Sequence, residues 1–266
     1  MPKPLLTHNT APAPSPEPAW RDDELASDPH AHADKAPKVR AMFAAIARSY
    51  DLNNRVHSLW QDQRWRASAV RAAAVQPGDR VLDVACGTGD LTQAFARTQA
   101  AEVVGLDFTR PMLDIAEHKQ TRLPAEAGAK IRYIEGDAMA LPFADAEFDV
   151  LSIAFGIRNV QRPLDALAEF ARVLKPGGRL VILEFDTPRF PPVRWFNSFY
   201  AGWVMPRTAT LISRDKSGAY RYLPKSVGAF MPREALMDAI ERVGFKNARA
   251  KPLSLGICVR YRAVRG

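Results

Sequence analysis

Cysteine is scarce in this sequence, and long apolar runs are missing. Among 266 residues the cysteines are Cys86 and Cys258. Two are too few for a disulfide framework, which points to a reducing compartment. No stretch approaches the roughly 18 consecutive apolar residues of a transmembrane helix. The sequence therefore predicts a cytoplasmic protein without a membrane span.

The first 37 residues lack apolar periodicity and hold eight of the 21 prolines. Such a composition is typical of a disordered tail, so residues 1–37 are predicted to be disordered. With six acidic residues against three basic ones, this stretch resembles neither an Arg-rich transit peptide nor a secretory signal. Its His30 and His32 are predicted to be solvated, and we predict no metal site.

Charge is unevenly distributed along the chain. The formal net charge is +8, yet residues 189–266 alone carry fifteen Lys and Arg against four Asp and Glu. A basic region of this kind favours contact with nucleic acid, with an anionic membrane or simply with water. The basic residues are interleaved with apolar ones and no RNA-binding module is recognisable, so no nucleic acid is expected.

Strand and helix patterns alternate through the middle of the chain. Such repeats predict an α/β fold with a doubly wound, mostly parallel, Rossmann-like sheet of seven strands. Residues 38–266 are expected to form one domain, with an N-terminal helical segment at 38–75 and a helical lid insertion at about 187–230. The predicted strands are 80–85, 102–107, 131–134, 148–155 and 179–184, with two more in 245–264, and the predicted helices are 88–97, 111–119, 164–174 and 234–243.

The turn after the first predicted strand has glycines at two positions in DVACGTGD (83–90). Gly87 and Gly89 allow a tight turn and a close approach of the backbone to a ligand. Asp107 ends the second predicted strand, where a carboxylate can accept both hydroxyls of a ribose. A Gly-x-Gly alone also fits an ordinary strand-to-helix turn, but together with Asp107 it favours nucleoside binding.

The nucleoside is more typical of S-adenosyl-L-methionine than of a dinucleotide. A dinucleotide fingerprint would place Gly or Ala at position 92, where this chain has Thr92. Asp83 suits a cofactor with a positive amino group near the first strand. Asp137 can accept from an adenine amino group while the Ala138 N–H donates to the ring. The alternative for Asp137 is a helix N-cap.

Two longer segments resemble the signatures of the ubiquinone/menaquinone-biosynthesis C-methyltransferases, which are class I methyltransferases. They are YDLNNRVHSLWQDQRW (50–65) and RVLKPGGRLVILE (172–184), and FGIRN (155–159) and YRYLPKS (220–226) are also similar. The resemblance covers the chain from about Val39 to its end. It implies S-adenosylmethionine as co-substrate, with the family's cofactor positions falling on Thr88, Asp107, Asp137 and Ala138.

The chain departs from the family pattern at six positions. The first signature usually has Met, an aliphatic residue, Gly and His where this chain has, in order, Asn53, His57, Trp60 and Asp62. Ala154 replaces a frequent cofactor-contacting Ser, and Asp186 stands where Ser or Thr is usual. These changes leave the cofactor prediction intact and leave the substrate open.

The reaction that the resemblance implies is methylation of a ring carbon of a polyprenylated quinol. A ring carbon is a weak nucleophile until a neighbouring hydroxyl loses its proton, so a base or a stabilising cation is required. We expect Arg158 and Asn159 to stabilise the phenolate, with Tyr50, Asp51 and Tyr222 lining the substrate side. The alternative is that Arg158 pairs with an acid to fix its loop.

Large side chains at Trp195, Phe199 and Trp203 recur every four residues, which predicts one stripe on a helix. Arg189, Arg194, Arg207, Arg214 and Lys216 surround it. We interpret 195–212 as a lid that admits the prenyl tail and contacts an anionic membrane, at the inner face of a bacterial cytoplasmic membrane. The alternative is a helix packed in the core.

Two other classes of function stay open at this point. The chain is also compatible with a methyltransferase of the same fold that acts on a small molecule or RNA, or with a non-catalytic nucleotide-binding protein. Benzoquinol and naphthoquinol substrates are equally compatible with the sequence. So are a monomer, a homo-oligomer and a biosynthetic complex.

Overall fold

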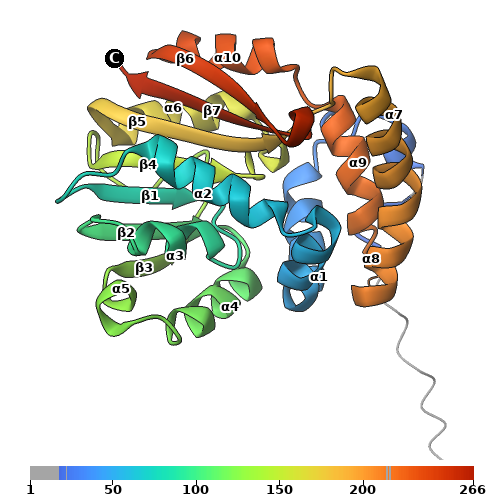
Figure 1. Cartoon of the computed structure of the whole chain (residues 1–266), viewed down its shortest axis with the longest axis horizontal. Coiled ribbons are helices and arrows are strands. Elements are labelled where there is room, and N and C mark those ends of the chain that lie inside the picture. Colours follow the sequence, from blue (N-terminus) through green and yellow to red (C-terminus); the bar gives the residue numbers. More distant parts are fainter. Residues whose placement is uncertain (1–17, 22, 214, 216) are drawn as a thin grey trace, which may run out of the picture.

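The computed structural model describes residues 18–21, 23–213, 215 and 217–266 (Figure 1). Seven strands of this part form one sheet in the order β3-β2-β1-β4-β5-β7-β6, with β7 antiparallel to both neighbours. The fold class predicted from the sequence is therefore confirmed. The strands are β1 (Arg80–Val84), β2 (Glu102–Asp107), β3 (Ile131–Glu135), β4 (Phe148–Ala154), β5 (Leu174–Phe185), β6 (Phe245–Leu253) and β7 (Cys258–Arg265).

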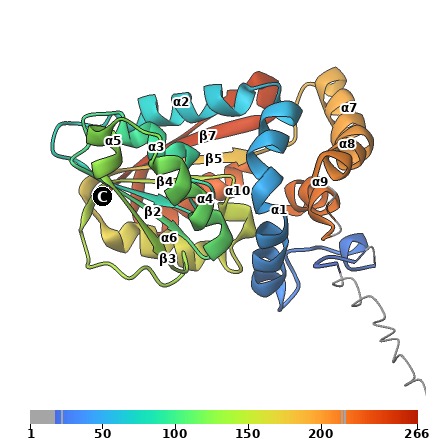
Figure 2. The same cartoon turned by 90° about the horizontal axis from the view of Figure 1, so that it is seen from below.

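Helices cover both faces of the sheet. Val81 and Leu82 are adjacent in β1 and both fully buried, so they contribute to cores on opposite faces, as the period-two alternation of a strand requires. Figure 2 shows the sheet between the two layers. One core includes α2 (Gln61–Ala73), α3 (Asp90–Ala96) and α5 (Ala125–Ala129), and the other includes α6 (Pro163–Val173) and α10 (Arg233–Arg242).

A third group of helices stands beyond the carboxyl ends of the parallel strands (Figure 1). It contains α1 (Lys35–Ser58), α7 (Pro191–Phe199), the π-helical turn η3 (Tyr200–Val204), α8 (Met205–Ser213) and α9 (Ala219–Ala229). The chain order reverses between β1 and β4, and α4 (Arg110–Gln120) follows β2. Ligands of doubly wound sheets bind at such a switch point, so these helices roof the expected site.

Part of the basic charge of the C-terminal region is used inside the fold. Arg262 of β7 donates through Nε to the carbonyl of Ala72 at 2.9 Å, and Arg265 donates to the carbonyl of Ala171 at 2.7 Å. These carbonyls lie in the last turns of α2 and α6, where cations stabilise the helix dipole. Part of the arginine excess therefore serves to bind helix ends within the fold.

The N-terminal prediction was wrong for the described part of the tail. Trp20 is fully buried, stacks on Tyr222 of α9 at 4.8 Å, and donates its backbone N–H to the carbonyl of Ser217. His30 also contacts α9, through the carbonyl of Ser226 at 2.8 Å. The polar, proline-rich composition of this stretch gave no sign that the Trp20 side chain would anchor it to α9. Residues 1–17 of the predicted tail lie outside the described part.

Replacing Trp20 with Ala should therefore destabilise the fold. Deleting a fully buried Trp side chain leaves a cavity and costs about 3–5 kcal/mol. The matched control is Trp60→Ala, because Trp60 is 61% exposed; its effect should be within about 0.5 kcal/mol. Equilibrium urea unfolding measures both. Equal, small effects would mean that the packing of Trp20 contributes nothing to the folded state.

Candidate functional site

The loop between β1 and α3 is shaped by its two glycines. Gly87 and Gly89 have φ angles of +55° and +79°, and a Cβ at Gly89 would lie 2.3 Å from the hydroxyl of Tyr133. The loop is tied to the end of β2, because Asp107 Oδ2 accepts the N–H of Gly87 at 2.8 Å. Asp107 Oδ1 accepts the N–H of Thr109, also at 2.8 Å. Burial raises the pKa of Asp107, while these N–H donors favour its charged form.

A small cavity of about 90 Å³ opens beside this loop. Four of the seven predicted cofactor residues line it: Gly87, Asp107, Asp137 and Ala138. No helix begins at Asp137; its Oδ1 accepts the N–H of Met139 at 2.9 Å in a tight turn, so the N-cap alternative is wrong. Residues that the sequence singled out for the cofactor thus line one small cavity, the cradle, at the carboxyl ends of β1 and β2.

Asp83 occupies a different position from the one expected. It lies under the loop, is 1% exposed, and lines neither this cavity nor the larger one described below. Its two oxygens accept the hydroxyls of Ser152 at 2.6 Å and Thr92 at 2.7 Å. Burial raises the pKa of Asp83 to about 6. The carboxylate therefore joins β1, β4 and α3 beneath the cradle.

A larger cavity of about 400 Å³ lies between α1, η3 and α9. Tyr50, Arg158 and Tyr222 line it, as the substrate-side prediction expected. Asn159 lines the small cavity instead and accepts the Tyr222 hydroxyl at 3.0 Å. Asp51 lines neither. The two cavities adjoin, since both are lined by the aromatic side chains of Phe43, Tyr50 and Phe155.

Arg158 is held rigidly at the wall of the large cavity. Its Nη1 donates to Glu184 Oε1 at 2.5 Å and to the carbonyl of Phe155 at 2.8 Å, and its side chain is 5% exposed. Pairing with an acid was the alternative considered for this residue. Arg158 is both paired with an acid and part of the cavity wall, because the paired guanidinium also lines the cavity.

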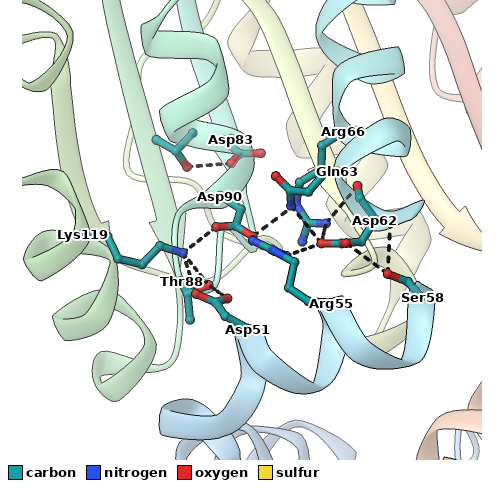
Figure 3. A network of polar contacts seen from close by, with 11 residues as sticks. Asp51, Arg55, Ser58, Asp62, Gln63, Arg66, Asp83, Thr88, Asp90 and Lys119 are labelled. Carbon is teal, nitrogen blue, oxygen red and sulfur yellow. Dashed lines mark hydrogen bonds and ion pairs between the residues drawn. The ribbon is translucent and has the colours of Figure 1, made fainter. Parts of the chain in front are cut away.

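Six charged residues of alternating sign connect α1 and α2 to the cofactor loop (Figure 3). Asp51 accepts hydrogen bonds from Thr88 Oγ1 and Lys119 Nζ, each at 2.6 Å. The predicted site residues Asp51 and Thr88 therefore both belong to this network. Although burial alone would raise it, Arg66 and Lys119 hold the pKa of Asp90 at about 2. The ion pairs are Asp51–Lys119, Lys119–Asp90, Asp90–Arg55, Arg55–Asp62, Asp62–Arg66 and, at 4.0 Å, Arg66–Asp90.

Arg66 is a site residue that the sequence prediction missed. It is 8% exposed, lines the large cavity, and lies 5.5 Å from the ring of Phe155. Its Nε is buried without a hydrogen-bond partner, and its contacts to Asp62 are long, at 3.4 and 3.5 Å. The available signal was its place directly after the first signature, which ends at Trp65. An incompletely paired guanidinium of this kind is suited to an anionic ligand.

The described residues offer neither a metal site nor a membrane span. They contain no group of three or more His, Cys, Asp or Glu side chains that could hold a metal ion. Nor does any helix in them have the length and apolar character needed to cross a membrane.

Known proteins resemble the chain over most of its length. The ubiE/COQ5 methyltransferase family matches residues 31–265. A demethylmenaquinone methyltransferase of Thermus thermophilus is 47% identical, over 81% of this chain and 96% of its own. A ubiquinone/menaquinone biosynthesis C-methyltransferase UbiE of Syntrophotalea carbinolica is 44% identical, over 85% and 94%.

Solved structures support the fold. A SAM-dependent methyltransferase of Aquifex aeolicus has a TM-score of 0.55 and 18% identity, covering 76% of this chain and 89% of its own. A chain from the complex of the Haloferax volcanii Trm112 activator with a methyltransferase has a TM-score of 0.58 and 17% identity, covering 84% and 96%. The resemblance predicted from the signatures is confirmed: the chain belongs to the ubiE/COQ5 methyltransferase family, with S-adenosylmethionine as its co-substrate.

Proposed function

We propose that this protein transfers the methyl group of S-adenosylmethionine to a ring carbon of a polyprenylated quinol. The observation that supports this proposal most is the junction of the two cavities, which share the lining residues Phe43, Tyr50 and Phe155. A cofactor in the small cavity would direct its sulfonium toward a ring in the large one. One of the relatives is named a demethylmenaquinone methyltransferase and the other a ubiquinone/menaquinone biosynthesis C-methyltransferase, and aromatic walls suit a planar ring.

The cradle supplies groups for the adenosine part. Each carboxylate oxygen of Asp107 accepts one backbone N–H, so each can still accept a second hydrogen bond from a ribose hydroxyl. Asp137 and Ala138 also line the cradle and offer a carboxylate and a backbone N–H for the adenine. Thr88 is turned away toward Asp51, so its role is to orient the loop.

The methionine part extends toward Arg66. The Nε of this guanidinium has no hydrogen-bond partner, and Asp90 Oδ2, at 4.0 Å, is too far away for a hydrogen bond. A cofactor carboxylate in the cavity that Arg66 lines would supply the missing acceptor. A buried donor that is left unsatisfied costs about 1–3 kcal/mol. The cofactor carboxylate is the anion that the reaction brings to this position.

Methyl transfer itself requires alignment and a dry site. The ring carbon must approach the methyl group in line with the C–S bond, and positioning of this kind lowers barriers by roughly 7–11 kcal/mol in favourable systems. Arg158, locked by Glu184, provides a fixed positive charge at the cavity wall for the ring oxygen. Because its partner is already in place, it needs little reorganisation when the phenolate forms.

The lid stripe supports contact with a membrane. Trp195, Phe199 and Trp203 are 73%, 49% and 54% exposed, so the alternative of a core-packed helix is wrong. Arg207 lies over the Trp203 ring at 4.5 Å. Tyr200, on the other side of the same turn, lines the large cavity. One face of the lid thus meets solvent with aromatic side chains while the other encloses the substrate site. Two of the predicted basic residues, Arg214 and Lys216, lie outside the described part.

Transfer of an isotope-labelled methyl group is the test of the reaction. Labelled S-adenosylmethionine should methylate a short-chain demethylmenaquinol, the corresponding benzoquinol, or both, and should leave RNA unlabelled. Label on RNA alone, or on none of the three, would contradict the proposal. The product ratio also decides between the two ring classes.

Binding of two cofactor analogues separates the roles of Asp107 and Arg66. S-adenosylhomocysteine carries the amino acid part, whereas 5′-methylthioadenosine lacks it. Asp107→Ala should weaken both ligands by about 2–4 kcal/mol, since charge-assisted bonds contribute about 1.5–3 each and are not additive. Arg66→Met should weaken S-adenosylhomocysteine by about 1.5–3 kcal/mol and leave methylthioadenosine unchanged. Calorimetry gives the affinities; a loss of both ligands in Arg66→Met would indicate a purely structural role.

Liposome flotation tests the membrane contact. Binding should require anionic lipid and fall with salt, because each basic residue near such a surface contributes about 1 kcal/mol. The double variant Trp195→Ala/Trp203→Ala and, separately, Arg194→Gln/Arg207→Gln should weaken it. Leu164→Ala, a change of an exposed residue of α6, is the matched control. Equal flotation of all variants, or none by the wild type at low salt, would reject the lid as a membrane contact.

A further inference from the structure

The turn between α1 and α2 holds two large apolar side chains in solvent. Leu59 is 76% exposed and Trp60 is 61% exposed, and their φ angles are +51° and +59°. The turn needs this left-handed backbone to end α1, because the N–H of Trp60 donates to the carbonyl of Arg55 at 2.9 Å. Glycine suits such positions, whereas a bulky side chain strains them. Neither side chain regains that cost by burial inside the fold, so the turn points to a contact outside it.

A second turn with the same features lies beside the first. It is the short helix η4 (Ser254–Gly256), where Leu255 is 74% exposed and has a φ angle of +58°. The hydroxyl of Ser254 accepts the indole N–H of Trp65 at 2.9 Å and donates to Gln61 Oε1 at 3.4 Å. Gln61 is the residue directly after the first turn, so the two turns adjoin. We call residues 59–60 and 254–256 the turn pair.

The turn pair borders the lid on both of its sides. The Tyr200 hydroxyl of η3 lies 3.3 Å from the backbone carbonyl of His57, two residues before the first turn. A Cβ on Gly256 would lie 3.7 Å from the Cα of Pro188, which precedes α7 by three residues. The exposed apolar side chains of the turn pair are therefore continuous with the part of the molecule that carries the exposed aromatic stripe of the lid.

The charge around the turn pair is positive. Lys251 and Arg260 lie directly opposite each other in the ladder of β6 and β7, where like charges destabilise a sheet. Residues 245–266 contain no acid, and Arg64 adds an exposed cation on α2. The acid nearest to the first turn in sequence, Asp62, is buried and paired with arginine. An anionic surface would relieve this repulsion.

We infer that the turn pair is a second membrane contact, which places Leu59, Trp60 and Leu255 among the headgroups of an anionic bilayer. Arg64 and Lys251 would attract the charge of that surface. Indole side chains favour the boundary between headgroups and acyl chains. Three side chains on two turn tips are also too few for a protein partner, because stable protein interfaces bury about 800 Å² on each side.

The inference rests on the membrane contact of the proposed function and adds orientation to it. A single amphipathic helix leaves the protein free to rotate about the axis of that helix. Contacts on two separate elements hold one side of the molecule against the bilayer, and the second contact forms at the high effective concentration that the first provides. The turn pair and the lid would together turn the carboxyl edge of the sheet toward the membrane.

Tryptophan fluorescence tests the contact at Trp60 itself. The chain has five tryptophans, and Trp20 and Trp65 are buried. In a Trp195→Phe/Trp203→Phe variant Trp60 is therefore the exposed indole that remains. Vesicles of phosphatidylcholine and phosphatidylglycerol with brominated acyl chains should quench its emission, and vesicles without phosphatidylglycerol should not. Adding Trp60→Phe to this variant is the matched control and should remove the quenching.

Flotation on the same vesicles measures the contribution of each turn. Trp60→Gly, which suits the left-handed backbone, and Leu255→Ala should each lower the partition coefficient about tenfold, or roughly 1.4 kcal/mol, the scale of partial burial of one large side chain. The midpoint of urea unfolding should not fall, and affinity for S-adenosylhomocysteine should not change. Leu164→Ala, at an exposed residue of α6, is the control.

The possible failures are distinguishable. A protein that floats while Trp60 stays unquenched would overturn the turn pair as a membrane contact and leave the lid in that role. Absence of flotation by the wild type would overturn both contacts. A dimer that Trp60→Gly dissociates, without quenching by lipid, would assign the turn pair to contact between copies and overturn the inference. Quenched Trp60 without any methylation of a quinol would support the inference and overturn the proposed reaction alone.

Discussion

The charge network between the N-terminal helices and the cofactor loop is the constraint on which the site depends (Figure 3). Arg55 bridges Asp62 and Asp90, and so joins α1, α2 and α3 at one point. Buried ion pairs often add little net stability, but removing one partner leaves an uncompensated charge that costs about 3–5 kcal/mol. The network therefore fixes position more than it adds stability. The network holds α1 so that Tyr50 and His57 lie over the strand ends. The sheet alone would supply only one side of the cavity wall there.

The lid completes the enclosure from the opposite side of the cavity. Tyr200 contacts α1 through His57, whereas Trp195 and Trp203 face outward. A polyprenyl substrate resides in a bilayer, so in the proposed function an amphipathic lid of this kind would link the place where the ring enters to the place where it reacts. Under the same proposal, the adjoining cavities would bring the reacting carbon and the methyl group together, and the packed aromatic walls would exclude water.

Local patterns in the sequence predicted the sheet and four of the residues that line the small cavity. β2 and the turn after β1 have strong signals, because buried strands are apolar runs and Gly87 and Asp107 sit where those runs end. Local patterns could not predict which residues distant along the chain pair or pack with each other. Glu184 reads as the last residue of a strand, yet it holds Arg158 from 26 positions away, and Trp20 stacks on a tyrosine near the other end of the chain. Asp83 was expected to face the ligand from its place four residues before Gly87. Its hydrogen-bond partners Thr92 and Ser152 come next to it only in the folded chain, so the sequence did not show that it would be buried beneath the loop.

The central claim is that cofactor and quinol meet at the junction of the two cavities. A crystal structure of the protein with S-adenosylhomocysteine and a short-chain demethylmenaquinol tests it most directly. The account predicts the adenosine against Asp107 and the quinol ring beside Tyr50 and Phe155. A ring bound elsewhere, or a cofactor whose sulfur points away from Tyr50, would contradict it.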